Sequence, residues 1–146
     1  MVAVPSIHQT TAKKQIVAGR LEEKSEDRIV LSLPGTDYRL HLLVDQQAMA
    51  GEVGKRVAGR ILSRAMRVDR VRVGGRFIEP VFGRPRRLQG RVTAIDPGAN
   101  TITVQCPCPI TCELSVNQKA GDFRPGELVA FDVKAGARFE PIGDGP

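Results

Sequence analysis

Two stretches of the chain, 71 residues apart, share one pattern of glycine, arginine and alternating apolar residues. The first, AGRLEEKSEDRIVLSL, begins at Ala18, and the second, QGRVTAIDPGANTITV, begins at Gln89. Two more pairs follow in the same order: VGKRVAGRI from Val53 matches PGELVAFDV from Pro125, and GRFIEP recurs as ARFEP. Three matched blocks in one order indicate an internal duplication. Each unit would hold about 65 to 70 residues, a size at which a small barrel can just sustain a core.

Apolar and polar residues alternate within each unit, which is typical of β-strands. The alternation covers residues 28–33 and 38–44 in the first unit, and 101–104 and 128–133 in the second. Pro-Gly pairs between these segments supply turns. We therefore expect an all-β fold made of two tandem small barrels of the OB or SH3-like type.

The prolines and glycine of IEPVFGRPRR, residues 78–87, place the boundary between the units because they interrupt any strand. A short helical turn is expected after Asp45, an N-cap residue followed by helix-forming residues. The alternative is a single merged barrel or sandwich in which both halves share one core. The predicted segments are a flexible tail over 1–14, a first barrel over 15–83, a second barrel over 84–141 and a flexible tail over 142–146.

Positive charge is concentrated in the middle of the chain. Residues 55–91 hold Lys55 and eleven arginines against Asp69 and Glu79, a local balance of +10 within a chain of net charge +6. Arginine outnumbers lysine 16 to 6. That bias suits bidentate binding of phosphate, but a GC-rich genome would give the same bias without any function.

Arg56, Arg60 and Arg64 recur every four residues, a spacing that fits one face of a strand or one face of a helix. Gly59 disfavours the helix, and the matching stretch of the second unit, PGELVAFDV, favours a strand. We predict a strand whose arginines point outward, about 13 Å from one to the next. The residues expected to point inward are Val57, Ile61 and Ala65.

The arginine block predicts a nucleic-acid-binding face, with RNA or single-stranded DNA as the partner. A solvated barrel wall is the alternative interpretation, because runs of charge are often no more than that. Only Phe77 and Phe82 could stack on bases within the block, so phosphate contacts would dominate. The candidate nucleic-acid-binding residues are Arg56, Arg60, Arg64, Arg67, Arg70, Arg72, Arg76, Arg84, Arg86 and Arg87.

The second unit resembles the TOBE barrels, small OB-like modules of molybdate-binding proteins and transporter ATPases. The resemblance implies binding of a small oxyanion of the molybdate type at a contact between subunits, and it places Arg91 and Lys134 in that site. It covers residues 88–135 through Leu88, Gly90, Arg91, Val92, Ile95, Ile102, Val104, Gly126, Val129, Phe131, Val133 and Lys134.

Three thiols lie within seven residues: Cys106, Cys108 and Cys112. They could supply three ligands of a zinc site with a histidine as the fourth, but their spacing is not that of a familiar zinc finger. We favour small buried cysteines on an edge strand, which Pro107 and Pro109 would protect from pairing with another chain.

No signal peptide or membrane-spanning segment is evident, so we expect a cytoplasmic protein without a membrane partner. The sequence has neither a nucleophile elbow nor a phosphate-binding loop, and we expect no enzymatic activity and no cofactor. The leading hypothesis is non-enzymatic binding of nucleic acid. The alternatives are an oxyanion-binding protein and a structural module that forms homo-oligomers or binds an acidic protein.

Overall fold

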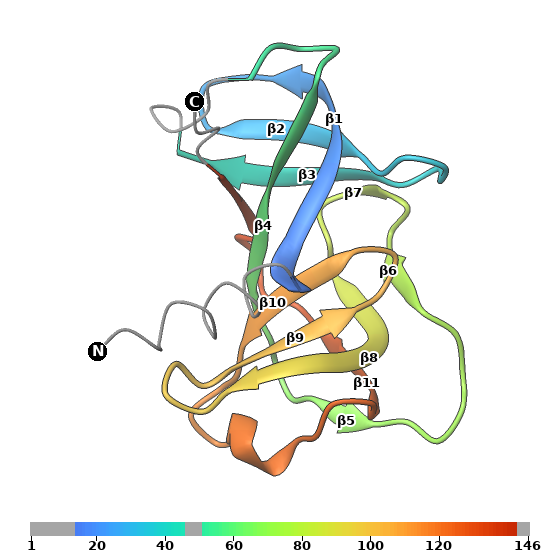
Figure 1. Cartoon of the computed structure of the whole chain (residues 1–146), viewed down its shortest axis with the longest axis vertical. Helices are drawn as coiled ribbons and strands as arrows, with labels where there is room; N and C mark the ends of the chain where they lie inside the picture. Colours follow the sequence, from blue (N-terminus) through green and yellow to red (C-terminus); the bar gives the residue numbers. More distant parts are fainter. Residues whose placement is uncertain (1–13, 46–50, 143–146) are drawn as a thin grey trace.

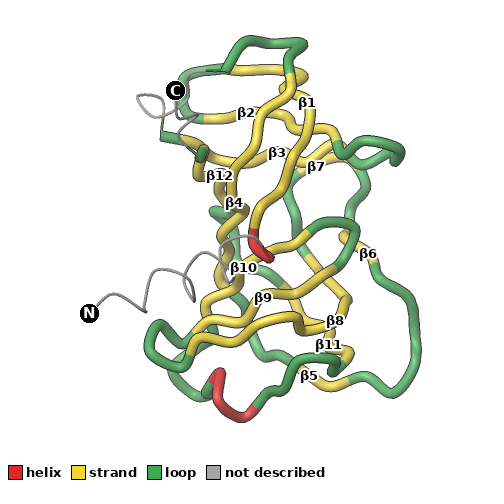
Figure 2. Tube along the Cα trace, in the orientation of Figure 1, coloured by secondary structure: helices red, strands yellow, loops and turns green. Residues whose placement is uncertain are grey.

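The computed structural model describes residues 14–45 and 51–142, and these residues form strands and loops almost throughout (Figure 2). The predicted all-β class is confirmed. The helical turn expected after Asp45, and nearly all of both predicted tails, lie outside the described residues. The elements are β1 (Ile16–Lys24), β2 (Arg28–Ser32), β3 (Arg39–Val44), β4 (Arg56–Arg64), β5 (Asp69–Arg70), β6 (Phe77–Glu79), β7 (Phe82–Gly83), β8 (Arg87–Asp96), β9 (Thr101–Gln105), β10 (Pro109–Glu113), the 3₁₀ turn η1 (Ala120–Asp122), β11 (Leu128–Asp132) and β12 (Arg138–Pro141).

Five strands close a barrel in the order β1, β2, β3, β12, β4, with β4 pairing back to β1. It occupies the upper part of Figure 1. The fifth strand comes from the far end of the chain: Arg138 of β12 lies parallel to β3 opposite Leu43 and antiparallel to β4 opposite Leu62. Strands from both predicted units therefore share one barrel.

The remaining long strands lie in the lower part of Figure 1, where β8 pairs with both β9 and β11, and β9 pairs with β10. The end of β4 joins this group, because Leu62, Ser63 and Arg64 run parallel to β10. An isolated bridge between Ala65 and Val133 connects the same segment with the end of β11. Thus β4 passes from the first set of strands into the second, whereas β12, which follows β11 in the sequence, joins the first set.

Local geometry recurs in the two sets at the offset seen in the sequence. A register shift between Leu21 and Glu23 in the β1–β2 pair has its counterpart between Val92 and Ala94 in the β8–β9 pair. The backbone N–H of Leu21 donates to a carbonyl oxygen at 2.9 Å, and the N–H of Val92 does the same at 2.9 Å; the acceptors are Lys55 and Glu127.

Gly19 and Gly90 occupy matching places where two strands approach too closely for a side chain. A Cβ on Gly19 would lie 2.7 Å from the carbonyl oxygen of Ser32, and a Cβ on Gly90 would lie 2.3 Å from that of Gln105. Backbone atoms cannot move away as a flexible side chain can, so only glycine fits at either position.

β4 is a strand, as the arginine spacing predicts, and its side chains alternate between the two sides of the sheet. Gly59, Ile61 and Ser63 are buried, whereas Arg56 and Arg64 are exposed. The buried apolar residues of both halves form one continuous cluster. β4 therefore faces this common core on one side and solvent on the other.

The prediction of an edge strand around the cysteines is wrong for β10. Its residues Thr111 to Glu113 pair with β4 on one side and with β9 on the other. Pro109 lies ahead of the part that pairs with β4, so its missing N–H does not interrupt that ladder.

Candidate anion-binding surface

The ten arginines predicted to bind nucleic acid lie on three separate parts of the fold. Arg56, Arg60 and Arg64 follow the outer side of β4, along the long axis of the molecule (Figure 1). A second group belongs to the segment 67–76, which includes β5, and a third group lies at 84–87, where the chain passes from β7 to β8. The ten residues therefore belong to three different segments of the fold and not to one strand.

Four of the ten arginines form an ion pair with a carboxylate. Arg60 is the most tightly engaged, since it forms an ion pair with Glu140 of β12 and also donates from a guanidinium nitrogen to Gln15 Oε1 at 2.9 Å. Three of the four partners come from strands or turns far along the chain. The other pairs are Arg67–Asp69 at 3.1 Å, Arg70–Glu127 at 2.8 Å and Arg87–Asp132 at 2.9 Å.

Arg70 is held from three sides. Besides its ion pair with Glu127, its guanidinium donates to the carbonyl oxygen of Asp122 and lies 4.6 Å from the centre of the Phe123 ring. The hydrogen bond from Arg70, reinforced by one from the backbone of Arg124, lowers the pKa of the Glu127 carboxyl below its usual value. Arg70 therefore ties β5 to the turn before β11 and is not free to bind a partner.

Six arginines have no carboxylate partner within residues 14–45 and 51–142: Arg56, Arg64, Arg72, Arg76, Arg84 and Arg86. Arg84 and Arg86 differ from the rest because an exposed aromatic ring lies beside them. Phe82 leaves 59% of its surface to solvent, and its neighbour Val81 is also exposed. We call Val81, Phe82, Arg84 and Arg86 the Phe82 surface.

The Phe82 surface borders an open cavity of about 900 Å³, which is also lined by Pro80 and by the paired Arg87 and Asp132. The Phe82 ring meets the edge of the His41 ring from β3, with 5.2 Å between the ring centres and 64° between the planes. That contact covers one part of the ring and leaves the remainder open to the cavity.

Backbone hydrogen bonds fix the segment that carries the Phe82 surface. β7 runs parallel to β3, with Phe82 opposite Arg39, and the N–H of Arg39 donates to the carbonyl oxygen of Val81 at 2.8 Å. Farther on, the N–H of Arg86 donates to the carbonyl oxygen of Glu79 at 2.8 Å. These bonds hold Phe82 and both arginines in place before any partner arrives.

A second cavity, of about 330 Å³, adjoins the Phe82 surface and shares Arg84 with it. His41 and Arg28 line it, together with Ala137 from the segment before β12. The Nε2 atom of His41 is buried and has no hydrogen-bond partner among the residues that the structure describes. Two arginines and a histidine thus border one cavity, which suits an anionic or hydrogen-bonding ligand.

Arg91 and Lys134, the residues that the TOBE resemblance places in an oxyanion site, do not come together. Arg91 pairs with Leu128 at the start of β11 and donates to the carbonyl oxygen of Gly126 at 2.9 Å. Lys134 follows the other end of β11, which puts the two residues about 20 Å apart along the strand. A single small oxyanion cannot touch both side chains within this chain.

All three cysteines are buried and in the free thiol form. Burial raises the pKa of Cys106 and of Cys112 to about 12, and it raises the pKa of Cys108 as well. The thiols therefore stay protonated at neutral pH and are poor nucleophiles. Within the described ranges, no group of three or more His, Cys, Asp or Glu residues is arranged to hold a metal ion.

Arg138 and Thr111 lie beside the arginine row of β4 and were not among the predicted site residues. Both reach it through pairing between distant segments. Leu62 of β4 lies opposite Arg138 of β12 on one side and opposite Thr111 of β10 on the other. No local motif marks either residue. Phe82, by contrast, carries a signal in the sequence, because it follows Pro80 and precedes Gly83 in a segment without strand alternation.

None of the helical segments in the described part of the chain is long and apolar enough to cross a bilayer. No protein-family model matches the chain, and no match to it is found among curated proteins or among solved structures.

Proposed function

We propose that this protein is a non-enzymatic binder of single-stranded nucleic acid and that the Phe82 surface is its contact site. In this proposal Arg84 and Arg86 bind phosphates of the backbone, and a base stacks on Phe82. One observation carries it: an exposed aromatic ring lies beside two arginines that form no ion pair with a described carboxylate, although Glu79 lines the same cavity. Proteins that bind single strands without strong sequence preference combine these two features.

The energetics favour a partner that offers both a flat apolar face and negative charge. Stacking of a base on an aromatic side chain contributes about 1–3 kcal/mol, and it tolerates any base because every base has a π face. Guanidinium groups add bidentate bonds to phosphate oxygens. Since Phe82 is the single exposed aromatic ring of the described residues, phosphate contacts would supply most of the affinity and sequence preference would be weak.

The recurring strand geometry supports a further part of the proposal, which concerns the origin of the fold. Register shifts, hydrogen bonds and close-approach glycines that repeat at offsets of 71 or 72 residues are those expected from two duplicated barrels of the OB or SH3-like type. In this description each unit donates one strand segment to the other. The Phe82 surface lies on the segment that connects the two units.

The test is binding of a fluorescently labelled oligonucleotide of about 15 nucleotides, measured by anisotropy at low and at physiological salt. We expect binding at low salt that weakens as salt rises, by about 0.7 log units per log unit of salt for each contacted phosphate. Absence of binding at low salt would overturn the proposed function.

A pair of variants locates the site. Phe82→Ala removes the stacking ring, and it should weaken binding about 5- to 100-fold, as expected for one lost base stack. Val73→Ala is the matched control, because Val73 is also an exposed apolar side chain and lies on the distant 71–76 loop. Equal affinity of Phe82→Ala and the unchanged protein would show that binding occurs elsewhere.

A further inference from the structure

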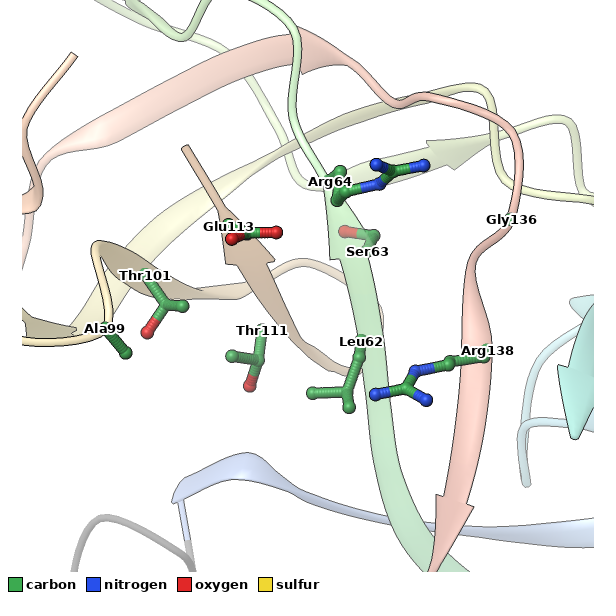
Figure 3. A pocket seen from close by; sticks show the side chains of 9 residues that line it. All are labelled: Leu62, Ser63, Arg64, Ala99, Thr101, Thr111, Glu113, Gly136 and Arg138. Carbon is green, nitrogen blue, oxygen red and sulfur yellow. The ribbon is translucent and has the colours of Figure 1, made fainter. Parts of the chain in front are cut away.

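A third cavity, of about 480 Å³, opens where β4 meets β10 on one side and β12 on the other (Figure 3). It adjoins the cavity of His41 and Arg84, since Gly136 lines both. The Phe82 surface, the His41 cavity and this third cavity therefore follow one another across the molecule. A strand bound at Phe82 could continue into the third cavity.

Two arginines reach this cavity from neighbouring strands. Arg138 lies opposite Leu62, and Arg64 is two residues farther along β4 on the same side of the sheet. Both side chains are exposed, and neither forms an ion pair with a carboxylate of residues 14–45 or 51–142. The cavity thus presents two guanidinium groups to a ligand (Figure 3).

The opposite side of the cavity carries a buried hydroxyl group without a described partner. Thr111 is only 6% exposed, and its Oγ1 atom is buried and makes no hydrogen bond within the described part of the chain. Glu113, the next residue on the same side of β10, makes no ion pair within the described ranges, although it lies opposite Arg64. Figure 3 shows both side chains at the cavity together with Thr101. A buried hydroxyl without a partner is rare in folded proteins and calls for an explanation.

The combination of groups defines the ligand. A bare phosphate would satisfy Arg64 and Arg138, but Glu113 would repel it. A ligand that satisfies the whole cavity carries an anionic group together with hydroxyl groups that can donate to Glu113 and bond with Thr111. A ribose phosphate has both, because its 2′-hydroxyl is at once a donor and an acceptor.

We propose that this cavity holds a ribose phosphate unit, with the phosphate on Arg138 and Arg64 and the 2′-hydroxyl on Thr111 and Glu113. The inference rests on the proposed function and makes it specific: the single strand bound through Phe82 is RNA. DNA lacks the 2′-hydroxyl and would leave the Thr111 hydroxyl without a partner, whereas water can still solvate the exposed Glu113.

The experiment compares oligouridylate with oligodeoxyuridylate of the same length, about 15 nucleotides, by anisotropy with the full chain. We expect the ribo form to bind about three- to tenfold more tightly, the factor that one net hydrogen bond supplies. Equal binding of the two strands overturns this inference and leaves the proposed function standing. Failure of both to bind overturns the proposed function itself.

Thr111→Val removes the unpartnered hydroxyl and keeps the shape of the side chain. It should reduce the preference for the ribo strand, with the contact to Glu113 remaining, and leave binding of the deoxy strand unchanged. Thr93→Val is the matched control, because its hydroxyl bonds to the carbonyl oxygen of Thr103 at 3.3 Å and does not line the cavity. A ribo preference that Thr111→Val leaves undiminished contradicts the assigned contact.

Arg138→Gln provides a second, independent variant on an exposed residue that the fold does not need for an ion pair. It should weaken binding of both strands, because both carry the phosphate, and Arg72→Gln serves as the charge-matched control. Free ribose 5-phosphate, added as a competitor, separates two sources of the same chemistry. If the free sugar phosphate displaces binding that persists in Phe82→Ala, the cavity is a metabolite site. If it competes only with binding of the strand to the unchanged protein, the result supports RNA.

Discussion

Arg60 of β4 and Arg70 of β5 come from the same continuous basic stretch of sequence as the arginines beside Phe82, yet the two groups have opposite surroundings. Arg60 and Arg70 meet carboxylates that distant parts of the chain supply, Glu140 and Glu127. Arg84 and Arg86 meet none among the described residues and lie beside an exposed ring. A high density of arginine therefore marks two different uses, and the position of acidic residues on remote strands decides between them.

The paired arginines act as connectors within the fold. Arg60 links β4 to β12, and Arg70 links β5 to the turn before β11, so each ties together segments that are far apart in sequence. The unpaired arginines make no such link. Removal of charge should accordingly affect stability in the first group and binding in the second.

The largest effect is expected from the double variant Arg84→Gln with Arg86→Gln. Loss of two phosphate contacts should weaken binding of single strands by about tenfold or more and reduce the salt slope by about 0.7 for each arginine. Arg67→Gln with Arg70→Gln removes the same charge and should leave the slope unchanged. If both double variants lose binding to the same extent, the distinction between paired and unpaired arginines has no functional meaning.

Arg70→Gln should reduce the free energy of unfolding by about 1 kcal/mol, because it removes an exposed ion pair and a cation–π contact together. Denaturant titration followed by circular dichroism measures this change. Arg72→Gln is the control, since Arg72 has no such contacts in the described structure. A destabilisation of Arg72→Gln as large as that of Arg70→Gln would count against the role of Arg70 as a connector.

Glu140→Gln tests the difference between paired and unpaired arginines by removing the acidic partner of Arg60. The Arg60 and Glu140 side chains are 35% and 44% exposed, so solvent screens their attraction and its loss should cost about 0.2–1 kcal/mol of stability. The change also leaves Arg60 without its carboxylate. Affinity for a single strand should rise slightly at low salt, and a fall in affinity would contradict the idea that Glu140 neutralises Arg60.

The smallest effect is a dependence on pH. Since Arg70 lowers the pKa of Glu127 in the folded chain, the ionised carboxylate stabilises the fold above the ordinary glutamate pKa of about 4.3. This contribution disappears as pH falls through the lowered pKa. The difference in melting temperature between the unchanged protein and Glu127→Gln should therefore shrink on acidification, and a difference that stays constant would contradict the linkage.

Local patterns in the sequence predict much of the fold. The spacing of Arg56, Arg60 and Arg64 predicts both the strand and its outward side, and Ile61 and Ala65 are buried as expected. Alternation is a property of neighbouring residues, so a single strand reveals it. The place of β12 in the barrel depends on pairing across the whole chain, which alternation within a strand cannot indicate.

The candidate site shows the same division. Arg84 and Arg86 belong to the predicted set, because the charge of the block is visible in the sequence. The importance of Phe82 emerges only when its exposure is known, and the pairing of Arg60 with Glu140 depends on two strands 80 residues apart. Composition gives the amount of charge, while long-range contacts determine how much of it remains free.

The strand β12 has a consequence for how the protein is made. Because residues 138–141 fill the gap between β3 and β4, a growing polypeptide exposes two open sheet edges until these residues have left the ribosome. At about 5–20 residues per second, this vulnerable interval lasts several seconds. A nascent chain that stops before β12 would offer those edges to its neighbours, so translation past β12 is what protects the five-stranded barrel from intermolecular pairing.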